Sequence, residues 1–231
     1  MTPGGRAGRA HLTLMTRFTA LVSSLLAGGC TVFGVRSGTP QPAYTVVGHV
    51  GAVELRDYGQ RLAADISAPG SEIEARSAGF RRLAAYIFGA NTRPGGGSGS
   101  IAMTAPVEQK AGQSSGGQQV AMTAPVAQAR AGAAGWTIRF FLPADMTLAS
   151  APQPRDAAIR LVEVPGARMA VLRFSGTPGV EAVARQRARL LAALADSAWK
   201  PAGEPVAWFY DPPWTLPWLR RNEVAVLVER R

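Results

Sequence analysis

The chain has 231 residues, of which 47% are hydrophobic, and this is enough apolar side chain for one large packed domain or two small ones. Lys and Arg number 25 against 15 Asp and Glu, but no Lys run, RGG tract, zinc-finger spacing or aromatic-basic motif is present, so nucleic acid is not an expected partner. One Cys excludes an intramolecular disulfide, and two His leave no room for a zinc site built on several imidazoles once His11 is removed with the N-terminal segment described next.

Residues 1–29 are typical of a targeting segment. Arg6, Arg9 and Arg17 precede the apolar run Phe18–Ala27, which at about ten residues suits a signal-peptide core and is too short to span a bilayer. Small residues lead directly into Cys30, so we expect cleavage before Cys30 and lipidation of its thiol. The prediction is a lipoprotein of the bacterial cell envelope that faces the periplasm, the alternative being an ordinary secretory signal with an incidental Cys.

Residues 30–42 are small, polar and Pro-containing, as in a tether, and residues 43–231 are expected to form a single domain. Ordered structure is expected to begin near Tyr44. Two strands are predicted next, Val53–Tyr58 and Arg61–Ser67, joined at Gly59.

A helix is predicted to follow, from Ser71 to about Phe88. Ser71 and Glu74 have the spacing of a capping box, and Gly89 is a natural stop. Its apolar side chains recur at helical spacing and are expected to share one buried face, with Arg76, Arg81 and Arg82 opposite. That face comprises Ile73, Phe80, Leu83, Ala84 and Ile87.

The heptapeptide Ile101–Val107 (IAMTAPV) recurs almost unchanged at Val120–Val126 (VAMTAPV). Bulky and small residues alternate in each copy, and Pro stops further pairing. Two edge-type strands are therefore predicted, joined by the flexible stretch Glu108–Gln119. Another strand is expected at Trp136–Leu142.

The pattern then restarts. Two strands, Ile159–Val164 and Arg168–Ser175, precede a second helix that Thr177-Pro178-Gly179 opens and that runs to about Ala195. The expected buried face of this helix comprises Val180, Val183, Ala184, Leu190, Leu191 and Leu194. Two strands complete the chain, at Val206–Tyr210 and Glu223–Val228.

Both halves therefore have the order strand–strand–helix–strand–strand, and Gly59–Ala63 corresponds to Gly166–Ala170. The predicted fold class is α+β: a duplicated unit that forms a distorted antiparallel barrel or sheet with two helices.

Catalytic residues are hard to find. The sequence contains no GxSxG motif whose serine could act with His49, so a Ser-His-Asp triad is not expected. Glu54, Glu163 and Glu223 are the strand carboxylates that an enzyme could use, but Glu54 and Glu223 are better interpreted as buried partners of Arg56 or Arg221. The protein is not expected to be an enzyme.

The segment 208–218 contains three of the five Trp residues together with three prolines. Aromatic side chains in so rigid a loop either close the end of a core or line an apolar pocket for a flat ligand. Both interpretations stay open. In the second, Arg220 and Arg221 would neutralise acidic groups of the ligand.

Several motifs in the same order resemble the bacterial branch of the SOUL haem-binding protein family. The resemblance covers about residues 44–228 and includes both MTAPV copies. The remaining motifs are AYIFGAN (Ala85–Asn91), WTIRFFLP (Trp136–Pro143), RFSG (Arg173–Gly176) and YDPPWTLPWLRRNEV (Tyr210–Val224).

The resemblance implies two helices on a distorted barrel and reversible binding of haem or a related tetrapyrrole, for storage, buffering or transfer. The implied site lies between the first helix and the loop before the last strand, with Arg220 and Arg221 facing the propionates. Its apolar residues would be Phe80, Leu83, Ala84, Ile87, Trp214, Leu216 and Trp218.

His49 is a candidate axial ligand of the iron, and Met103, Met122 and Tyr86 are the other possible donors. Two other functions stay open: binding or hydrolysis of another small hydrophobic molecule by a domain that resembles effector-binding domains, or a structural module of the envelope.

Overall fold

The computed structural model describes residues 38–112 and 135–231. Cys30, the apolar run before it, Met122 and the second MTAPV copy lie outside these residues, so the expectations for them remain predictions. The described elements are β1 (Tyr44–Val50), β2 (Val53–Tyr58), β3 (Arg61–Ala68), α2 (Glu72–Ile87), β4 (Asn91–Thr92), β5 (Val107–Ala111), β6 (Trp136–Phe141), β7 (Gln153–Pro154), β8 (Ile159–Val164), β9 (Ala167–Phe174), α3 (Val180–Ala195), β10 (Trp199–Pro201), β11 (Val206–Phe209), the 3-10 helix η1 (Pro217–Leu219) and β12 (Asn222–Arg230).

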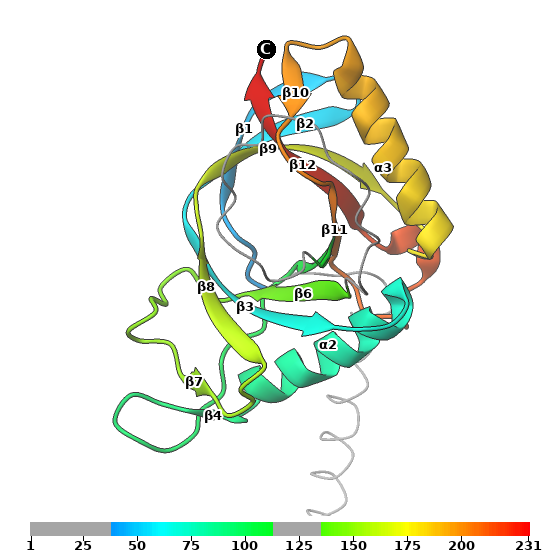
Figure 1. The fold of residues 1–231 in the computed structure, drawn as a ribbon. Helices are drawn as coiled ribbons and strands as arrows, with labels where there is room; N and C mark the ends of the chain where they lie inside the picture. The colour runs from blue at the N-terminus through cyan, green and yellow to red at the C-terminus, as the bar shows by residue number, and fades with distance from the viewer. Residues whose placement is uncertain (1–37, 113–134) are drawn as a thin grey trace, which may run out of the picture.

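Ten of these strands form one antiparallel sheet in the order β1-β2-β9-β12-β11-β5-β6-β3-β8, with β10 paired to the end of β12. Strands β4 and β7 form a separate two-stranded sheet. The large sheet curls strongly, but its edge strands β1 and β8 do not pair with each other, so it does not close into a barrel (Figure 1). The α+β prediction is confirmed in its open-sheet form.

The order of the strands also confirms the two repeated units. Strands β2, β3, β5 and β6 of the first half correspond to β8, β9, β11 and β12 of the second, and exchanging the halves leaves the order of these eight strands unchanged. The pair β5–β11 lies at the centre. Strand β2 pairs with β9, and β8 pairs with β3, so each half contributes a strand to the other half's side of the sheet.

Both helices lie on the outer, convex face of the curled sheet (Figure 1). Helix α2 packs on β3 and β6, and α3 packs on β9, β10 and β12. Because successive side chains of a strand alternate between faces, each strand gives one set of apolar side chains to these helices and the other set to the inner face. Two helix-facing cores result, one around Leu83 and Ile138 and one around Leu190 and Val226.

The start of α2 is as predicted, but its buried face is not. The Ser71 hydroxyl accepts a hydrogen bond from the Glu74 backbone N–H, and Glu74 accepts one from the Ser71 N–H, which is the capping box. The buried residues of α2 are Glu72, Ala75, Gly79, Leu83, Tyr86 and Ile87, whereas Ile73 and Phe80 are exposed.

Close packing of α2 on the sheet explains this rotation. A Cβ atom at Gly79 would lie 2.5 Å from Ile138 Cγ1, so the helix approaches β6 more closely than any larger residue at position 79 would allow. The residues nearest the sheet are therefore small, and a pattern that counts only large apolar residues places the buried face incorrectly.

Helix α3 also departs from the prediction. Gly179 is its N-cap and provides no side-chain hydrogen bond, so the helix begins two residues later than a Thr177 cap followed by Pro178 would give. Val183, Leu190 and Leu194 are buried as expected. Val180, Ala184 and Leu191 are exposed, because a 16-residue helix on one face of a sheet buries only a narrow stripe.

The first MTAPV copy is not a strand. Residues 101–106 are irregular, and strand β5 begins at Val107, the last residue of the copy, and continues to Ala111 in the stretch that was expected to be a flexible linker. Backbone groups of this segment bond to other parts of the chain: Ile101 N–H to Ile87 O, and Ala105 N–H to Pro40 O. Pro106 has no N–H and follows a cis peptide bond, so the segment cannot continue a strand ladder.

Candidate functional site

The outer side of α2 carries exposed apolar side chains. Ile73 and Phe80 lie two turns apart on this side, and the Phe80 ring meets the edge of Phe140 with centroids 5.3 Å apart. Phe80 therefore packs on the buried ring of Phe140 while it remains 38% exposed. This gives α2 a rigid aromatic side chain at the surface.

The loop between β11 and β12 presents two Trp side chains. Trp214 is 62% exposed and Trp218, in η1, is 68% exposed. The loop is held in shape by Arg220, whose guanidinium donates to the backbone oxygens of Thr215 and Pro213. Trp208, by contrast, is in β11 and buried, so Trp208 belongs to the core, and ligand binding by Trp214 and Trp218 stays a prediction.

The loop and α2 flank the same short segment at the start of α3. Arg76 of α2 donates two hydrogen bonds to Pro178 O, and the Gly176 N–H donates to Pro217 O in the loop. In Figure 1 this segment, residues 176–178, lies beside the first turns of α2 and α3. We call the surface formed by Ile73, Phe80, Trp214, Trp218 and Leu219 the outer aromatic surface.

Not all residues implied for the site reach this surface. Leu83 and Ile87 are buried in the core beneath α2, where they support the helix and cannot touch a ligand outside it. Ala84 and Leu216 are partly buried. Arg220 belongs to the loop, but Arg221 does not accompany it, because its side chain is engaged on the inner face of the sheet.

The inner face, opposite the helices, holds a buried charge network centred on Glu223. One Glu223 oxygen accepts from Arg56 at 3.1 Å and from Arg221 at 2.7 Å, and the other accepts from Arg56 at 2.9 Å and from the Tyr210 hydroxyl at 2.7 Å. Glu54 also pairs with Arg56 at 2.7 Å. The prediction that Glu54 and Glu223 are partners of these arginines is confirmed.

This arrangement fixes the ionisation of Glu223. Burial alone raises the pKa of its carboxyl, but the hydrogen bonds and charge of Arg56, the charge of Arg221 and the Tyr210 hydroxyl outweigh burial and lower it. Burial and the nearby Glu223 charge raise the pKa of Tyr210 well above its usual value. Glu223 is therefore a permanently ionised structural group and is unsuited to proton transfer near neutral pH.

A second network lies beside the first. Arg139 pairs with Asp65 at 2.6 Å and with Glu108 at 3.1 Å, and Glu108 also accepts from Trp208 Nε1 at 2.9 Å. Together, the two networks neutralise most of the charge on the inner face within the protein.

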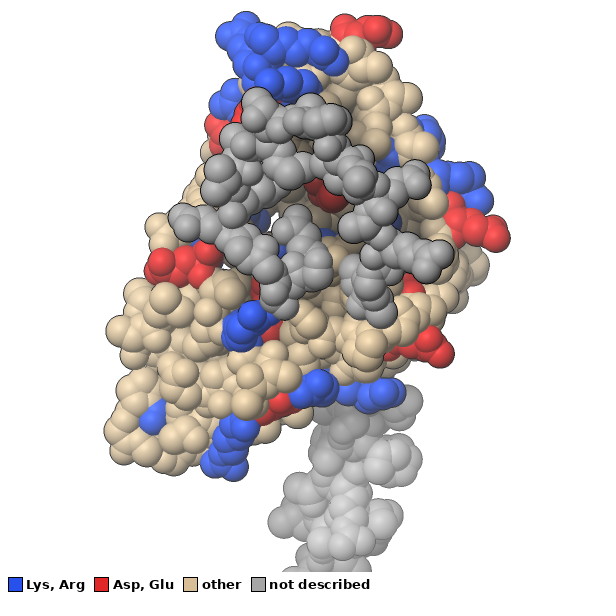
Figure 2. All heavy atoms as spheres, viewed as in Figure 1, with Lys and Arg blue, Asp and Glu red and all other residues tan. Residues whose placement is uncertain are grey.

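On the visible surface of the molecule, basic and acidic side chains are interspersed (Figure 2).

His49 lies apart from the outer aromatic surface. It is exposed on the edge strand β1, opposite Glu54, whereas α2 packs on β3 and β6 near the other edge of the sheet. Tyr86 is buried and its hydroxyl donates to Pro152 O, and Met103 packs against the core under α2. Within residues 38–112 and 135–231, no three His, Cys, Asp or Glu side chains group as a metal site.

Comparison with protein families places this geometry in context. The model described as SOUL heme-binding protein matches residues 39–227, which is most of the chain. The chain belongs to the SOUL haem-binding protein family. The resemblance found in the ordered motifs is therefore confirmed.

Solved structures that share this fold are distant in sequence. The crystal structure of the EcmrR C-terminal domain has a TM-score of 0.51 at 11% identity, covering 81% of this chain and 99% of that one. An EcmrR–DNA complex also reaches 0.51, at 9% identity, covering 96% and 67%. A hydrolase from Listeria innocua gives 0.46 at 9% identity, covering 84% and 94%. At these identities the likeness to this SOUL-family chain concerns the fold alone.

A comparison with curated proteins finds no match.

Sequence reasoning missed one feature of this region. Arg61, at the start of β3, stacks on two aromatic rings of the inner face and lines a cavity of about 400 Å³. Alternation of β3 could have assigned Arg61 to the face opposite Leu62, but it could not show which rings lie beside it.

Proposed function

We propose that this protein reversibly binds haem or a related tetrapyrrole on the outer aromatic surface and catalyses no reaction. Membership of the SOUL family supports the ligand class. The observation that carries the proposal is the exposure of Phe80 and Trp218 on two rigid elements that flank the same turn. Large exposed aromatic side chains on a soluble domain typically mark a binding surface.

The residues present fit a flat, largely apolar ligand with acidic edges. Phe80 and Trp218 offer ring faces and edges for stacking, and Ile73 extends the apolar area along α2. Arg220 is partly exposed beside them, and the donors that it does not use for Thr215 and Pro213 suit a propionate. The porphyrin would supply its own redox chemistry, while these side chains would hold and orient the ring.

Iron coordination by His49 remains a prediction of the sequence. Because His49 lies on β1, away from α2 and its loop, we expect ring stacking to provide most of the affinity. Metal-free porphyrin should then bind nearly as well as haemin.

The ion pairing and exposure of the strand carboxylates support the proposal that the protein catalyses no reaction. Glu223 is held ionised by two arginines, and Glu54 is paired with Arg56. Glu163 is exposed on β8. Of the three, only Glu223 is buried, and its pKa is lowered, whereas a general acid would need a raised one.

The cellular setting is proposed from the sequence before residue 38. The apolar run Phe18–Ala27 and the small residues before Cys30 support a lipid anchor in the bacterial envelope, with the domain facing the periplasm. No helix among the described residues is long and apolar enough to cross a membrane. Such an anchored protein would store, buffer or transfer its ligand at the membrane surface.

Haemin titration of the full chain, followed by the Soret band, tests the ligand. We expect saturable binding near one equivalent, with protoporphyrin IX binding in parallel. Trp218→Ala and Phe80→Ala should each weaken binding by roughly tenfold, because each removes a stacking ring. Leu148→Ala is the matched control, since Leu148 is also exposed but lies in another loop.

Two outcomes distinguish the alternatives. Loss of the Soret shift in His49→Ala, with porphyrin binding retained, would establish His49 as the iron ligand. No saturable binding of either tetrapyrrole in the micromolar range would overturn the proposal and favour another hydrophobic ligand or a structural role.

The anchor has its own test. Mass spectrometry of the protein from bacterial membranes should find an N-terminus at Cys30 that carries a diacylglyceryl group, and Cys30→Ser should move the protein out of the membrane fraction. An unmodified thiol at Cys30 would contradict lipid anchoring.

A further inference from the structure

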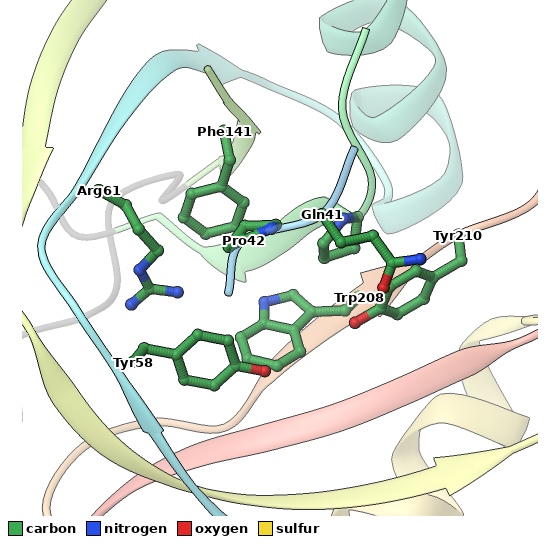
Figure 3. Close-up of a pocket in the computed structure, with 8 residues that line it drawn as sticks. Gln41, Pro42, Tyr58, Arg61, Phe141, Trp208 and Tyr210 are labelled. Carbon is green, nitrogen blue, oxygen red and sulfur yellow. The ribbon is translucent and has the colours of Figure 1, made fainter. Parts of the chain in front are cut away.

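Arg61 occupies an unusual position on the inner face. It begins β3, and its neighbour Leu62 belongs to the helix-facing core, so the Arg61 side chain lies on the opposite face. Its guanidinium lies 4.6 Å from the centroid of the Tyr58 ring and 4.9 Å from that of Phe141. Figure 3 shows the guanidinium pointing toward Tyr58 beside the Phe141 ring.

Arg61 differs from its arginine neighbours in its partners. Arg56, Arg139 and Arg221 each donate to a carboxylate. Among the described residues, the buried Nε of Arg61 has no hydrogen-bond acceptor. The two rings attract the cation but provide no lone pairs in its plane. Arg61 thus carries one buried N–H donor that lacks an acceptor among the described residues.

The carboxylate that acts electrostatically on Arg61 is already engaged by other donors. Glu108 interacts electrostatically with Arg61, but one of its oxygens accepts from Arg139 and the other from Trp208. Burial lowers the pKa of Arg61, yet a guanidinium remains protonated at physiological pH. A buried cation without an acceptor is unfavourable, and an external anion would relieve this cost.

Arg61 lines a cavity large enough for such an anion. The cavity has a volume of about 400 Å³, within the range of small-molecule sites. Pro42, Pro143 and Met146 are among the apolar residues that line it. A second space of about 10 Å³, enough for one water molecule, shares Gln41, Pro42 and Arg61 and continues to Trp208 and Tyr210 (Figure 3).

We propose that this cavity binds a small monocarboxylate with a flat apolar body, and that Arg61 holds the carboxylate. A carboxylate matches the planar fork of a guanidinium, whereas a neutral or cationic ligand would leave Arg61 without an acceptor. The apolar body would contact Pro42, Pro143 and Met146. Glu163 lines the same cavity and disfavours a second negative charge. This site is separate from the outer aromatic surface and does not depend on tetrapyrrole binding.

Calorimetric titration of the full chain with matched probes tests the proposal without any variant. 3-Phenylpropionate should bind saturably at one site, and 3-phenylpropanol, which lacks the charge, should bind about tenfold more weakly or worse, since a charge-assisted hydrogen-bonded pair is absent. Phthalate, a dicarboxylate, and tetraphenylphosphonium, a cation, should not compete. Equal binding of the acid and the alcohol, or no binding of the acid, would overturn the proposal.

Variants then test whether Arg61 is responsible for the binding of 3-phenylpropionate. Arg61→Gln should lower 3-phenylpropionate affinity at least about tenfold, and Arg61→Lys should restore part of it, because the charge returns without the planar fork. Arg160→Gln is the matched control, since Arg160 is exposed on β8 and does not line the cavity.

Nitrogen-15 NMR provides a readout that a purely structural role would not move. The Nε–H resonance assigned to Arg61 by its loss in Arg61→Gln should shift on addition of 3-phenylpropionate. Unchanged affinity in Arg61→Gln, or no shift of that resonance while the acid binds, would contradict the assignment.

Discussion

At the scale of single residues, Glu223 connects strands that are far apart in the chain. Arg56 and Glu223 are 167 positions apart, and they meet across β9 because β2, β9 and β12 are neighbours in the sheet. The sequence indicated which carboxylates and arginines would pair. It could not indicate that one carboxylate accepts from two arginines and a tyrosine, since that depends on the order of the strands.

Replacing this carboxylate should be strongly destabilising. Glu223→Gln keeps the shape but leaves the buried guanidinium of Arg56 without its main counter-charge, so we expect a loss of about 3–5 kcal/mol in the free energy of unfolding. Urea denaturation measures it. Glu229→Gln, on the same strand but exposed and only loosely paired with Lys200, should change stability by less than about 0.5 kcal/mol. Similar effects of the two changes would contradict a structural role for the network.

The same group predicts a pH dependence. The pKa of Glu223 is lower in the folded protein than its ordinary value of 4.5. Its contribution to stability is therefore present above pH 4.5 and is lost as the pH falls through the lowered folded pKa. The stability difference between the wild type and Glu223→Gln should shrink as the pH is lowered from 7 toward 3. A difference that stays constant over this range would show that Glu223 does not titrate as argued.

At the scale of elements, strands were easier to predict than helix faces. Seven strands lie within two residues of their predicted bounds, because Gly and Pro mark their ends and their apolar residues alternate. The buried face of α2 was misplaced because Gly79 and Ala75, which no hydrophobicity pattern singles out, lie nearest the sheet. The aromatic loop and Phe80 were predicted for the site, whereas the role of Arg61 depends on rings brought in by β2 and β6.

Close approach of α2 to β6 makes a specific prediction for Gly79. Alanine raises helix propensity by about 1 kcal/mol, but its Cβ would overlap Ile138. We expect Gly79→Ala to destabilise the protein by about 1–3 kcal/mol in urea denaturation, and Ile138→Val to recover part of the loss in the double variant. Ser77→Ala, on the exposed side of the same helix, is the control. A more stable Gly79→Ala protein would show that α2 does not pack this closely.

At the scale of the whole molecule, the exchange of strands ties the two halves together. Strand β2 is bordered by β9, and β8 by β3, so neither half completes its part of the sheet alone. The repeated order was readable from the sequence, because turns and strands recur in register. The sequence did not indicate which half supplies the strand next to β2 or β8, since pairing within a half and pairing between halves give the same alternation of side chains.

This connection predicts a single cooperative transition. Thermal unfolding followed by calorimetry should give equal calorimetric and van't Hoff enthalpies, and tryptophan fluorescence and far-ultraviolet circular dichroism should report the same midpoint. Separate midpoints for the two probes would indicate that the halves unfold independently.

Strand β12 lies between β9 and β11 although it is the last strand of the chain. A nascent chain would therefore already contain β9 and β11, but it would lack the strand that joins them until synthesis is almost finished. Folding of this sheet must be largely post-translational, and a stop codon that removes only the final strand would leave a chain unable to build the middle of its sheet. The export proposed above would benefit from such a delay, because the chain would stay unfolded until it had crossed the membrane.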